Sequence, residues 1–237
     1  MILLRTTQSG LSLKETESQA PMLFYNIAKN ALKILDRFSP YPILHPFVMS
    51  NEEMRVFDEE IKDAKYYLEF GLGGSTIRAI QRSKAIIHTV ESSTDWVKEM
   101  RRYLLVRQHE KRRLRIFSVD IGPVLEWGYP KSDNFKNSFE TYSSGIFQSI
   151  DCSQIDLILV DGRFRVACTL KSILECQVNS SVKILIHDFW NRPQYHTVLQ
   201  YLDIVKKVDT IGLFSIKNGI DRESLLRDYE VYKLIPE

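Results

Sequence analysis

A glycine-rich turn that follows a short apolar run constrains this chain more than any other stretch. Residues 66–70 form the run and include Glu69; Gly71, Gly73 and Gly74 form the turn; and Ser75-Thr76 can begin a helix. Glycine permits a sharp turn and lets the backbone approach a ligand where a Cβ atom would clash. The helix would direct its unpaired N–H groups and the positive end of its dipole toward that ligand. Many α/β proteins use such a turn only to pass from strand to helix, so the surrounding sequence decides.

A second acidic residue stands where a ribose-binding group is expected. Residues 85–90 form another apolar run, followed at once by Glu91, which lies 22 residues after Glu69. This separation is about what a βαβ unit with a ribose-binding acid requires. The two stretches therefore favour a ligand site over a plain structural turn.

These motifs resemble the first two motifs of the class I S-adenosylmethionine-dependent methyltransferases, and the order of elements resembles that superfamily over residues 66–235. The resemblance implies a Rossmann-like fold and S-adenosylmethionine as cofactor. It assigns cofactor binding to the turn, to the helix start, to Glu91 and to the end of the third strand. The residues concerned are Glu69, Gly71, Gly73, Ser75, Thr76, Glu91 and Asp120. Asp120 could instead only form the turn before Gly122-Pro123.

The pattern of apolar runs predicts one α/β domain with a mostly parallel, seven-stranded, twisted sheet and helices on both faces. Strands are expected at 66–70, 85–90, 114–119, 155–161, 182–188, 209–217 and 230–235. Helices are expected at 21–38, 51–63, 75–82, 94–108, 166–178 and 194–206. The last two strands would form a closing hairpin. We expect a loose arm and helical extension over 1–49, which could cap the cofactor or hold a partner subunit, and the methyltransferase-like domain over 50–237.

Composition excludes several classes of protein. The chain has 237 residues, 44% of them hydrophobic, and a net charge of only +2. One α/β core fits that length, and the small charge gives no global field for nucleic acid or membranes. No apolar run approaches the roughly 20 residues of a membrane span, and the first apolar residues are too few for a signal peptide. Cys152, Cys168 and Cys176 lack metal-binding spacing and indicate reduced thiols in a cytoplasmic protein.

Two strand ends carry the candidate catalytic residues, which are Asp161, His187 and Asp188. Because carboxyl ends of parallel strands hold ligands in open α/β sheets, these residues could converge beside the methyl donor. Asp161 and Asp188 could chelate a divalent cation, as the paired acids of metal-dependent O-methyltransferases do, although Gly162 and Phe189 depart from that pattern. We favour no metal. His187 or a desolvated Asp161 could act as general base; alternatively, both only satisfy local hydrogen bonds.

Candidate substrate-binding residues surround the same edge. Residues 121–150 are rich in aromatics and predict an active-site flap without regular structure, with Trp127 and Tyr129 as contacts. Arg163, Arg165 and Arg192 follow strands that end there, which suggests an anionic acceptor. Alternatively, these arginines pair with Asp156, Asp161 or Asp188 and only hold the loops.

The function that this sequence favours is O-methylation, dependent on S-adenosylmethionine, of a small or glycan-like acceptor. The alternatives are a methyltransferase-like domain that binds a nucleotide or partner without methyl transfer, and a Rossmann-type oxidoreductase. The oxidoreductase would need a third glycine near position 76, where this chain has Thr76. A basic stretch over 101–115 is interrupted by Glu110 and lacks interleaved aromatics, so we favour a solvated helix face over nucleic-acid binding.

Overall fold

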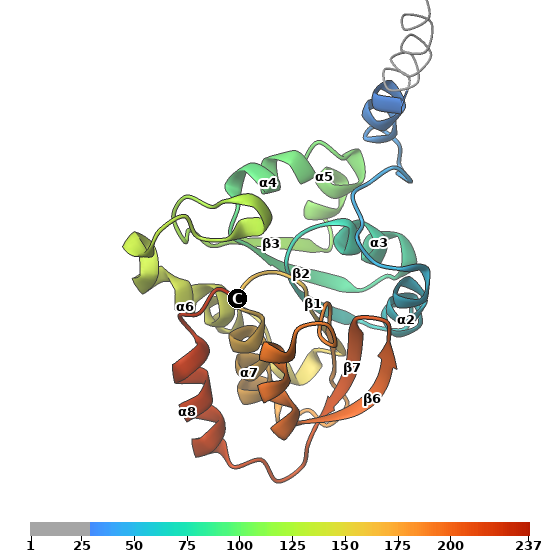
Figure 1. Cartoon of the computed structure of the whole chain (residues 1–237). Helices are drawn as coiled ribbons and strands as arrows, with labels where there is room; N and C mark the ends of the chain where they lie inside the picture. Colours follow the sequence, from blue (N-terminus) through green and yellow to red (C-terminus); the bar gives the residue numbers. More distant parts are fainter. Residues whose placement is uncertain (1–28) are drawn as a thin grey trace, which may run out of the picture.

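A single seven-stranded sheet organises the molecule (Figure 1). The computed structural model describes residues 29–237. The strands are β1 (Tyr66–Phe70), β2 (Ile86–Glu91), β3 (Leu114–Ser118), β4 (Leu157–Val160), β5 (Lys183–Ile186), β6 (Leu202–Val208) and β7 (Ile211–Ile216). Their order is β3-β2-β1-β4-β5-β7-β6, and only β7 runs antiparallel to its neighbours. The predicted mostly parallel, seven-stranded fold is confirmed.

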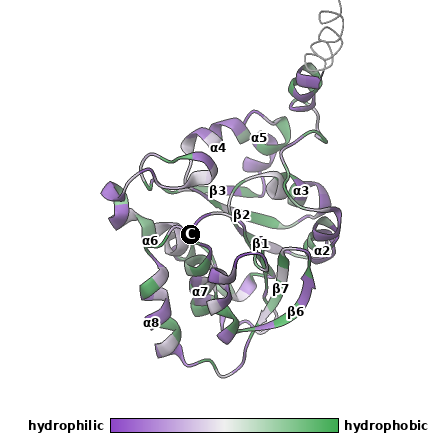
Figure 2. Cartoon of the chain, viewed as in Figure 1, coloured by the Kyte–Doolittle hydropathy of each residue, from purple (hydrophilic) through white to green (hydrophobic). Residues whose placement is uncertain are grey.

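Helices cover both faces of this sheet. One face packs against α2 (Asn51–Ile61), α3 (Gly74–Arg82), α4 (Thr94–Met100) and α5 (Leu104–Glu110). The other packs against α6 (Lys136–Ser144), α7 (Arg165–Cys176) and α8 (Arg222–Tyr232). Successive residues of a strand enter opposite cores, as Tyr67 and Leu68 do. Hydrophobic residues therefore run along the strands, whereas the helices show mixed faces (Figure 2).

Two predictions between β2 and β4 need correction. The helix expected over 94–108 is interrupted, because residues 101–103 form a turn between α4 and α5. The segment 121–150, expected to lack regular structure, contains α6 and several short 3₁₀ turns. Phe139, Tyr142 and Ile146 recur at helical spacing and are all buried, so this part of the segment packs as core.

The prediction for the last forty or so residues is also wrong in part. Residues 194–206 do not form a helix: a 3₁₀ segment, Pro193–Gln200, leads into β6, an edge strand that exposes Ile204 and Val205. Residues 230–235 do not form a strand. They lie at the end of α8, which Asp221 caps by accepting from the Ser224 N–H and which buries Leu225 and Tyr229. The closing hairpin is therefore β6–β7.

The N-terminal prediction is only partly covered. Residues 29–36 are helical within the expected 21–38 and extend away from the sheet (Figure 1). The arm over 1–20, and the stripe positions Leu23 and Ile27, lie outside the described residues, and the division at residue 49 stays a prediction. Within residues 29–237, no helix is both long enough and apolar enough to span a membrane.

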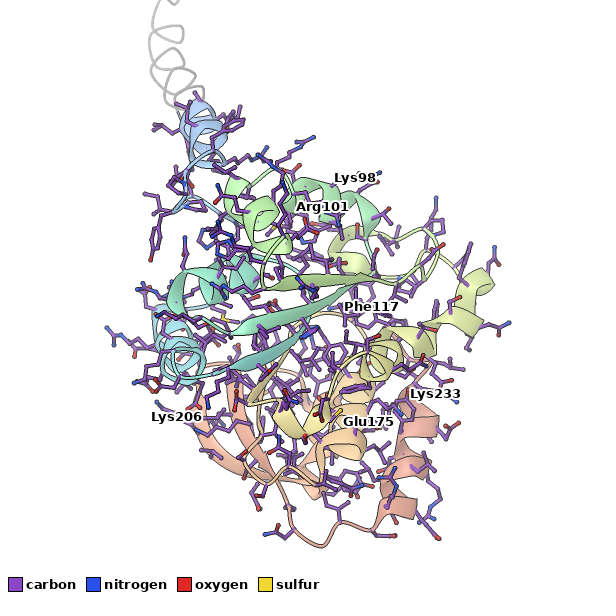
Figure 3. All side chains as sticks on the ribbon, turned by 180° about the vertical axis from the view of Figure 1, so that it is seen from behind. Lys98, Arg101, Phe117, Glu175, Lys206 and Lys233 are labelled. Atoms are coloured by element: carbon purple, nitrogen blue, oxygen red, sulfur yellow. The ribbon has the colours of Figure 1, made fainter. Side chains whose placement is uncertain are left out.

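The basic stretch is ion-paired only at its start. Arg101, in the turn after α4 (Figure 3), pairs with Glu110 at 2.8 Å, and Arg102 pairs with Glu99 at 2.7 Å. Arg113 donates instead to backbone carbonyls, including that of Ala85 at 2.8 Å. This arrangement fits the favoured solvated helix face.

Glu53 connects the start of α2 to the sheet. Its Oε2 accepts from the Ser50 N–H at 2.9 Å, which completes a capping box with Ser50. Its Oε1 accepts from the Thr210 N–H at 2.9 Å and the Thr210 hydroxyl at 2.6 Å. One buried carboxylate thus joins α2 to the turn before β7.

We expect Glu53→Ala to lower the free energy of unfolding by at least about 2 kcal/mol, because several buried donors lose their acceptor at about 1–3 kcal/mol each. Chemical denaturation measures the change. The control is Glu52→Ala on the same helix, which removes only an exposed pair with Arg55 and should change stability by less than about 0.5 kcal/mol. Equal effects of the two substitutions would contradict this role of Glu53.

Candidate active site

The turn after β1 meets the turn after β4 at the carboxyl edge of the sheet. Gly71 has φ +109°, and a Cβ atom there would lie 2.9 Å from the Gly162 backbone nitrogen. An L-residue would therefore be strained and would clash with backbone. A Cβ atom on Gly73 would instead meet nothing within 4 Å. The turn therefore packs tightly against Gly162 at Gly71 and leaves open space next to Gly73.

Glu69 holds the start of α3 from inside the core. Its carboxyl is fully buried and accepts from the Ser75 hydroxyl and, at 2.7 Å, from the Thr76 hydroxyl. Thr76 also accepts from the Gly73 N–H at 2.9 Å. Burial raises the pKa of Glu69 to about 8, against the opposing effect of the two hydroxyl bonds. Glu69, Ser75 and Thr76 therefore shape the turn from beneath it.

Glu91 ends β2 and lies against the glycine turn. Its Oε2 accepts from the Leu72 N–H at 3.2 Å, and its Oε1 accepts from the Ser92 and Ser93 N–H groups at 2.8 Å each. Burial raises the pKa of Glu91, although these backbone donors act in the opposite direction. The structure thus brings the glycine turn and Glu91 into direct contact.

Asp120 lies farther out along the same edge. Its side chain is exposed, and its Oδ1 accepts from the Gly122 N–H at 2.9 Å, which is the turn-forming role considered as the alternative. Gly122 has φ +84°, as that turn requires.

Within the segment 121–150, which was predicted to be an active-site flap, residues 123–131 form a small hairpin. The name flap is kept for this hairpin alone. Val124 and Pro130 make an antiparallel bridge, and the Leu125 N–H donates to the Tyr129 carbonyl at 2.7 Å. A Cβ atom on Gly128 would lie 3.6 Å from Arg163 and 3.7 Å from Ser92, so the flap spans the ends of β2 and β4. Tyr129 stacks on the Arg163 guanidinium at 4.1 Å, whereas Trp127, at the tip, is 70% exposed. Only Tyr129 of the two predicted contacts reaches the crevice wall.

Asp161 and His187 form a pair at the ends of β4 and β5. The His187 Nδ1 donates to the Asp161 Oδ1 at 2.9 Å, and its Nε2 lies 3.6 Å from the Glu53 Oε2. Burial opposes ionisation, yet the charge and hydrogen bond of Asp161 raise the pKa of His187. Burial also pushes the pKa of Asp161 upward, but His187 and Arg165 hold it below its usual value. The imidazole therefore sits between two carboxylates, buried from the crevice.

Asp188 is engaged by two of the predicted substrate arginines. Its Oδ2 lies 3.3 Å from the Arg165 Nη1 and 2.8 Å from the Arg192 Nη2. Arg165 also pairs with Asp161 at 3.1 Å and donates to the His187 carbonyl at 2.5 Å. These contacts are the ones expected if Arg165 and Arg192 hold the loops together; their role in substrate binding stays a prediction.

Arg163 differs from both. It is only 4% exposed, yet its Nε and Nη1 have no hydrogen-bond partner within residues 29–237, and it makes no ion pair there. The Tyr129 ring covers its guanidinium. Of the three arginines, Arg163 alone keeps its charge available to a ligand.

No family model and no curated protein matches this chain. Among solved structures, it is similar to a methyltransferase-like protein from Silicibacter pomeroyi DSS-3, with 25% identity and a TM-score of 0.66 over 81% of this chain and 98% of that one. A methyltransferase from Geobacter sulfurreducens shows 14% identity and a TM-score of 0.47, covering 86% of this chain and 91% of that one. Only the first superposes closely enough to bear on the fold.

The chain has the class I methyltransferase fold. The sheet order and the glycine turn beside Glu91 agree with that similarity, so the resemblance drawn from the sequence is confirmed.

The donor set does not fit a divalent cation in this methyltransferase-like site. Arg165 pairs with both Asp161 and Asp188, and Arg192 also pairs with Asp188. Among residues 29–237, no group of three His, Cys, Asp or Glu side chains is arranged to hold a metal ion. Gly162 and Phe189 stand where the metal-dependent O-methyltransferases have a second acid and an amide ligand.

Sequence reasoning missed three residues of this site. Glu53 belongs to a local capping box on α2, but its contact with His187 joins it to the end of β5, which is distant in sequence. Tyr142 places its hydroxyl 3.4 Å from the Arg163 N–H and belongs to the helix that was not predicted. Glu237 accepts from the Val166 N–H at 2.6 Å, and no local pattern links positions 71 residues apart.

Glu69 should make folding stability depend on pH. Its pKa rises from the usual 4.5 to about 8 on folding, so between these values the unfolded chain ionises Glu69 while the folded chain keeps it neutral. This contribution to stability is therefore lost as pH rises from about 4.5 to about 8. Glu69→Gln, which cannot ionise, should have a flatter profile in denaturant unfolding at pH 5 and pH 8. Parallel profiles for the two proteins would rule out a neutral Glu69.

Proposed function

We propose that this chain is an S-adenosylmethionine-dependent methyltransferase that methylates an oxygen of a small or glycan-like, anionic acceptor. The observation that carries the proposal is the direct contact between the glycine turn and Glu91, through the Leu72 N–H. These are the two motifs on which the cofactor-binding resemblance rests.

The residues at the crevice suit this cofactor. Gly71 and Gly73 would pass beneath the methionine part, where the space above Gly73 is open. Glu91 would accept from a ribose hydroxyl at Oε2, which so far accepts only from the Leu72 N–H and can accept a second bond. Asp120 would contact the adenine amino group. When bound, S-adenosylmethionine would supply a methyl group on a sulfonium, which is displaced in line by the acceptor oxygen.

Asp161 is the candidate base. Its side chain keeps 27% of its surface exposed at the end of β4, so it can meet an acceptor hydroxyl. Because His187 and Arg165 lower its pKa, Asp161 would be a weak base and would take the proton only as the new C–O bond forms and the hydroxyl becomes acidic. His187 contacts Asp161 and not the crevice, so its role would be to position Asp161. Asp188, bound by Arg165 and Arg192, would hold the loops that frame the acceptor.

The acceptor would lie between the flap and the end of β4. Tyr129 and Arg163 form one wall, and Trp127 at the flap tip could close over a larger glycan. A buried guanidinium favours an anionic group on that acceptor.

A cytoplasmic location and a homo-oligomer remain predictions from the sequence. The buried, free Cys168 and Cys176 are consistent with a reducing compartment.

Two substitutions test the cofactor site by calorimetry with S-adenosylhomocysteine. Glu91→Gln should weaken binding at least about tenfold, because hydrogen bonds to a charged group contribute roughly 1.5–3 kcal/mol each. Gly73→Ala should also weaken binding, since its Cβ atom would enter the open space, while the melting temperature stays unchanged. Asp95→Asn, on exposed α4, is the control. Absence of binding by the unmutated chain would reject the cofactor assignment.

Asp161→Asn tests the catalytic assignment. We expect kcat to fall by roughly 10²–10⁴ because the general base is lost, whereas affinity for S-adenosylhomocysteine stays the same. Turnover is measured as S-adenosylhomocysteine release with a panel of uronic acids, phosphorylated sugars and nucleotide sugars. Asp203→Asn on the edge strand β6 serves as control. Retention of full kcat by Asp161→Asn would exclude Asp161 as the base.

A further inference from the structure

The buried charge of Arg163 lacks a counter-ion. A guanidinium that loses its hydration must recover that free energy from an anion or from hydrogen bonds, at a cost of several kcal/mol if it does not. Within residues 29–237, Arg163 has the Tyr129 ring and no acceptor. Neighbouring Arg165, equally buried, has two carboxylates and three carbonyls as partners. The contrast indicates that Arg163 is kept for a ligand.

The first turn of α7 begins two residues after Arg163 and already binds a carboxylate. Phe164, the N-cap residue of this twelve-residue helix, offers no side-chain acceptor. Instead Glu237 reaches the Val166 N–H with its Oε1 at 2.6 Å, while its Oε2 is buried with no partner in the described part of the chain. The charge of Arg163 acts on this carboxyl, although the two do not form an ion pair.

We infer that Arg163 and the Val166 N–H form a carboxylate-binding subsite for the methyl acceptor, and that Glu237 occupies it in the absence of the acceptor. The inference rests on the proposed function and identifies the anionic group as a carboxylate. Arg163 lies two residues after Asp161. A carboxylate in this subsite would therefore hold a hydroxyl of the same acceptor near the proposed base, as a hydroxy acid or a uronic acid can.

Glu237 is an imperfect occupant and so can be displaced. Burial raises its pKa to about 7, despite the Val166 N–H and the nearby charges of Arg163 and Arg165. Half of its hydrogen-bonding capacity is unused, because Oε2 has no partner among the described residues. An acceptor carboxylate placed closer to Arg163 would satisfy both the guanidinium and the helix N-terminus. Lys233, which pairs with Glu140 of α6 at 3.1 Å, would hold the start of the 233–237 segment in place (Figure 3).

Binding of two probe sugars tests this subsite. D-glucuronate carries the carboxylate, and D-glucose is its neutral counterpart. We expect Glu237→Ala to bind glucuronate at least tenfold more tightly than the unmutated chain, and glucose to bind none of the proteins measurably. Adding Arg163→Ala to Glu237→Ala should abolish the gain. Glu223→Ala, which removes an exposed acid at the start of α8, should leave glucuronate binding unchanged.

Stability and cofactor affinity separate this inference from its competitors. Arg163→Ala should melt no earlier than the unmutated chain, since it removes a buried charge that has no counter-ion; an early melt would make Arg163 structural and overturn the inference. A tenfold loss of S-adenosylhomocysteine affinity in Arg163→Ala would assign this arginine to the cofactor carboxylate and overturn it too. If no protein binds S-adenosylhomocysteine, the proposed function fails while the glucuronate measurement still stands. If cofactor binds but Glu237→Ala brings no gain for glucuronate, the subsite alone is rejected.

Discussion

The close contact between the Gly71 and Gly162 backbones fixes the geometry of the whole edge. Strands β1 and β4 are neighbours in register, so the turns that leave them must pass each other within van der Waals distance. Side chains at either position would force these turns apart; a Cβ atom on Gly162 would also lie 2.1 Å from the Tyr142 hydroxyl. Because neither residue has a side chain, the ends of β1 and β4 stay close together, with Glu91 bonded to one turn and Asp161 beginning the other.

The charged side chains at this edge are of two kinds. Some are paired within the protein and support the loops, and others have no partner in the described chain and can recognise a ligand. Arg165 and Arg192 neutralise Asp188, and Arg165 also reaches Asp161. Removing one partner of such a buried pair leaves a charge uncompensated, at a cost of about 3–5 kcal/mol, so these pairs fix the loops. Arg163 and the Glu237 Oε2 stand apart from that network, each buried and each without a partner in the described chain. Unused hydrogen-bond donors and acceptors are rare in a structural core. At the edge of the sheet that faces a ligand, they are the groups that a binding site needs.

The central strands were predictable because their sequence carries one unambiguous signal. Strands β4 and β5 lie in the middle of the sheet, so both of their faces are covered and nearly every residue is apolar. Strand β6 lies at the edge and alternates poorly, with Asp203, Lys206 and Lys207 beside exposed Ile204 and Val205, so its residues resemble an amphipathic helix. Likewise, the positions of Glu69 and Glu91 follow from local motifs, whereas the contacts of Glu53 and Glu237 join distant parts of the chain and leave no local pattern.

Backbone strain concentrates around the same crevice. Trp127, Phe164 and Asp188 all adopt left-handed backbone angles, with φ of 62°, 55° and 55°, a conformation that costs a non-glycine residue about 1–3 kcal/mol. At Phe164 the surrounding packing offsets that cost, because its ring is fully buried between Phe139 and Tyr142, with centroids 5.3 and 5.5 Å away. The left-handed turn at Phe164 reverses the chain between Arg163 and the first residue of α7. Arg163, before this turn, lies under Tyr129, and Val166, after it, has its N–H in the first turn of α7. Helix α6, which supplies both aromatic neighbours of Phe164, is therefore part of what positions the unpaired arginine, although it contributes no charge of its own to the crevice.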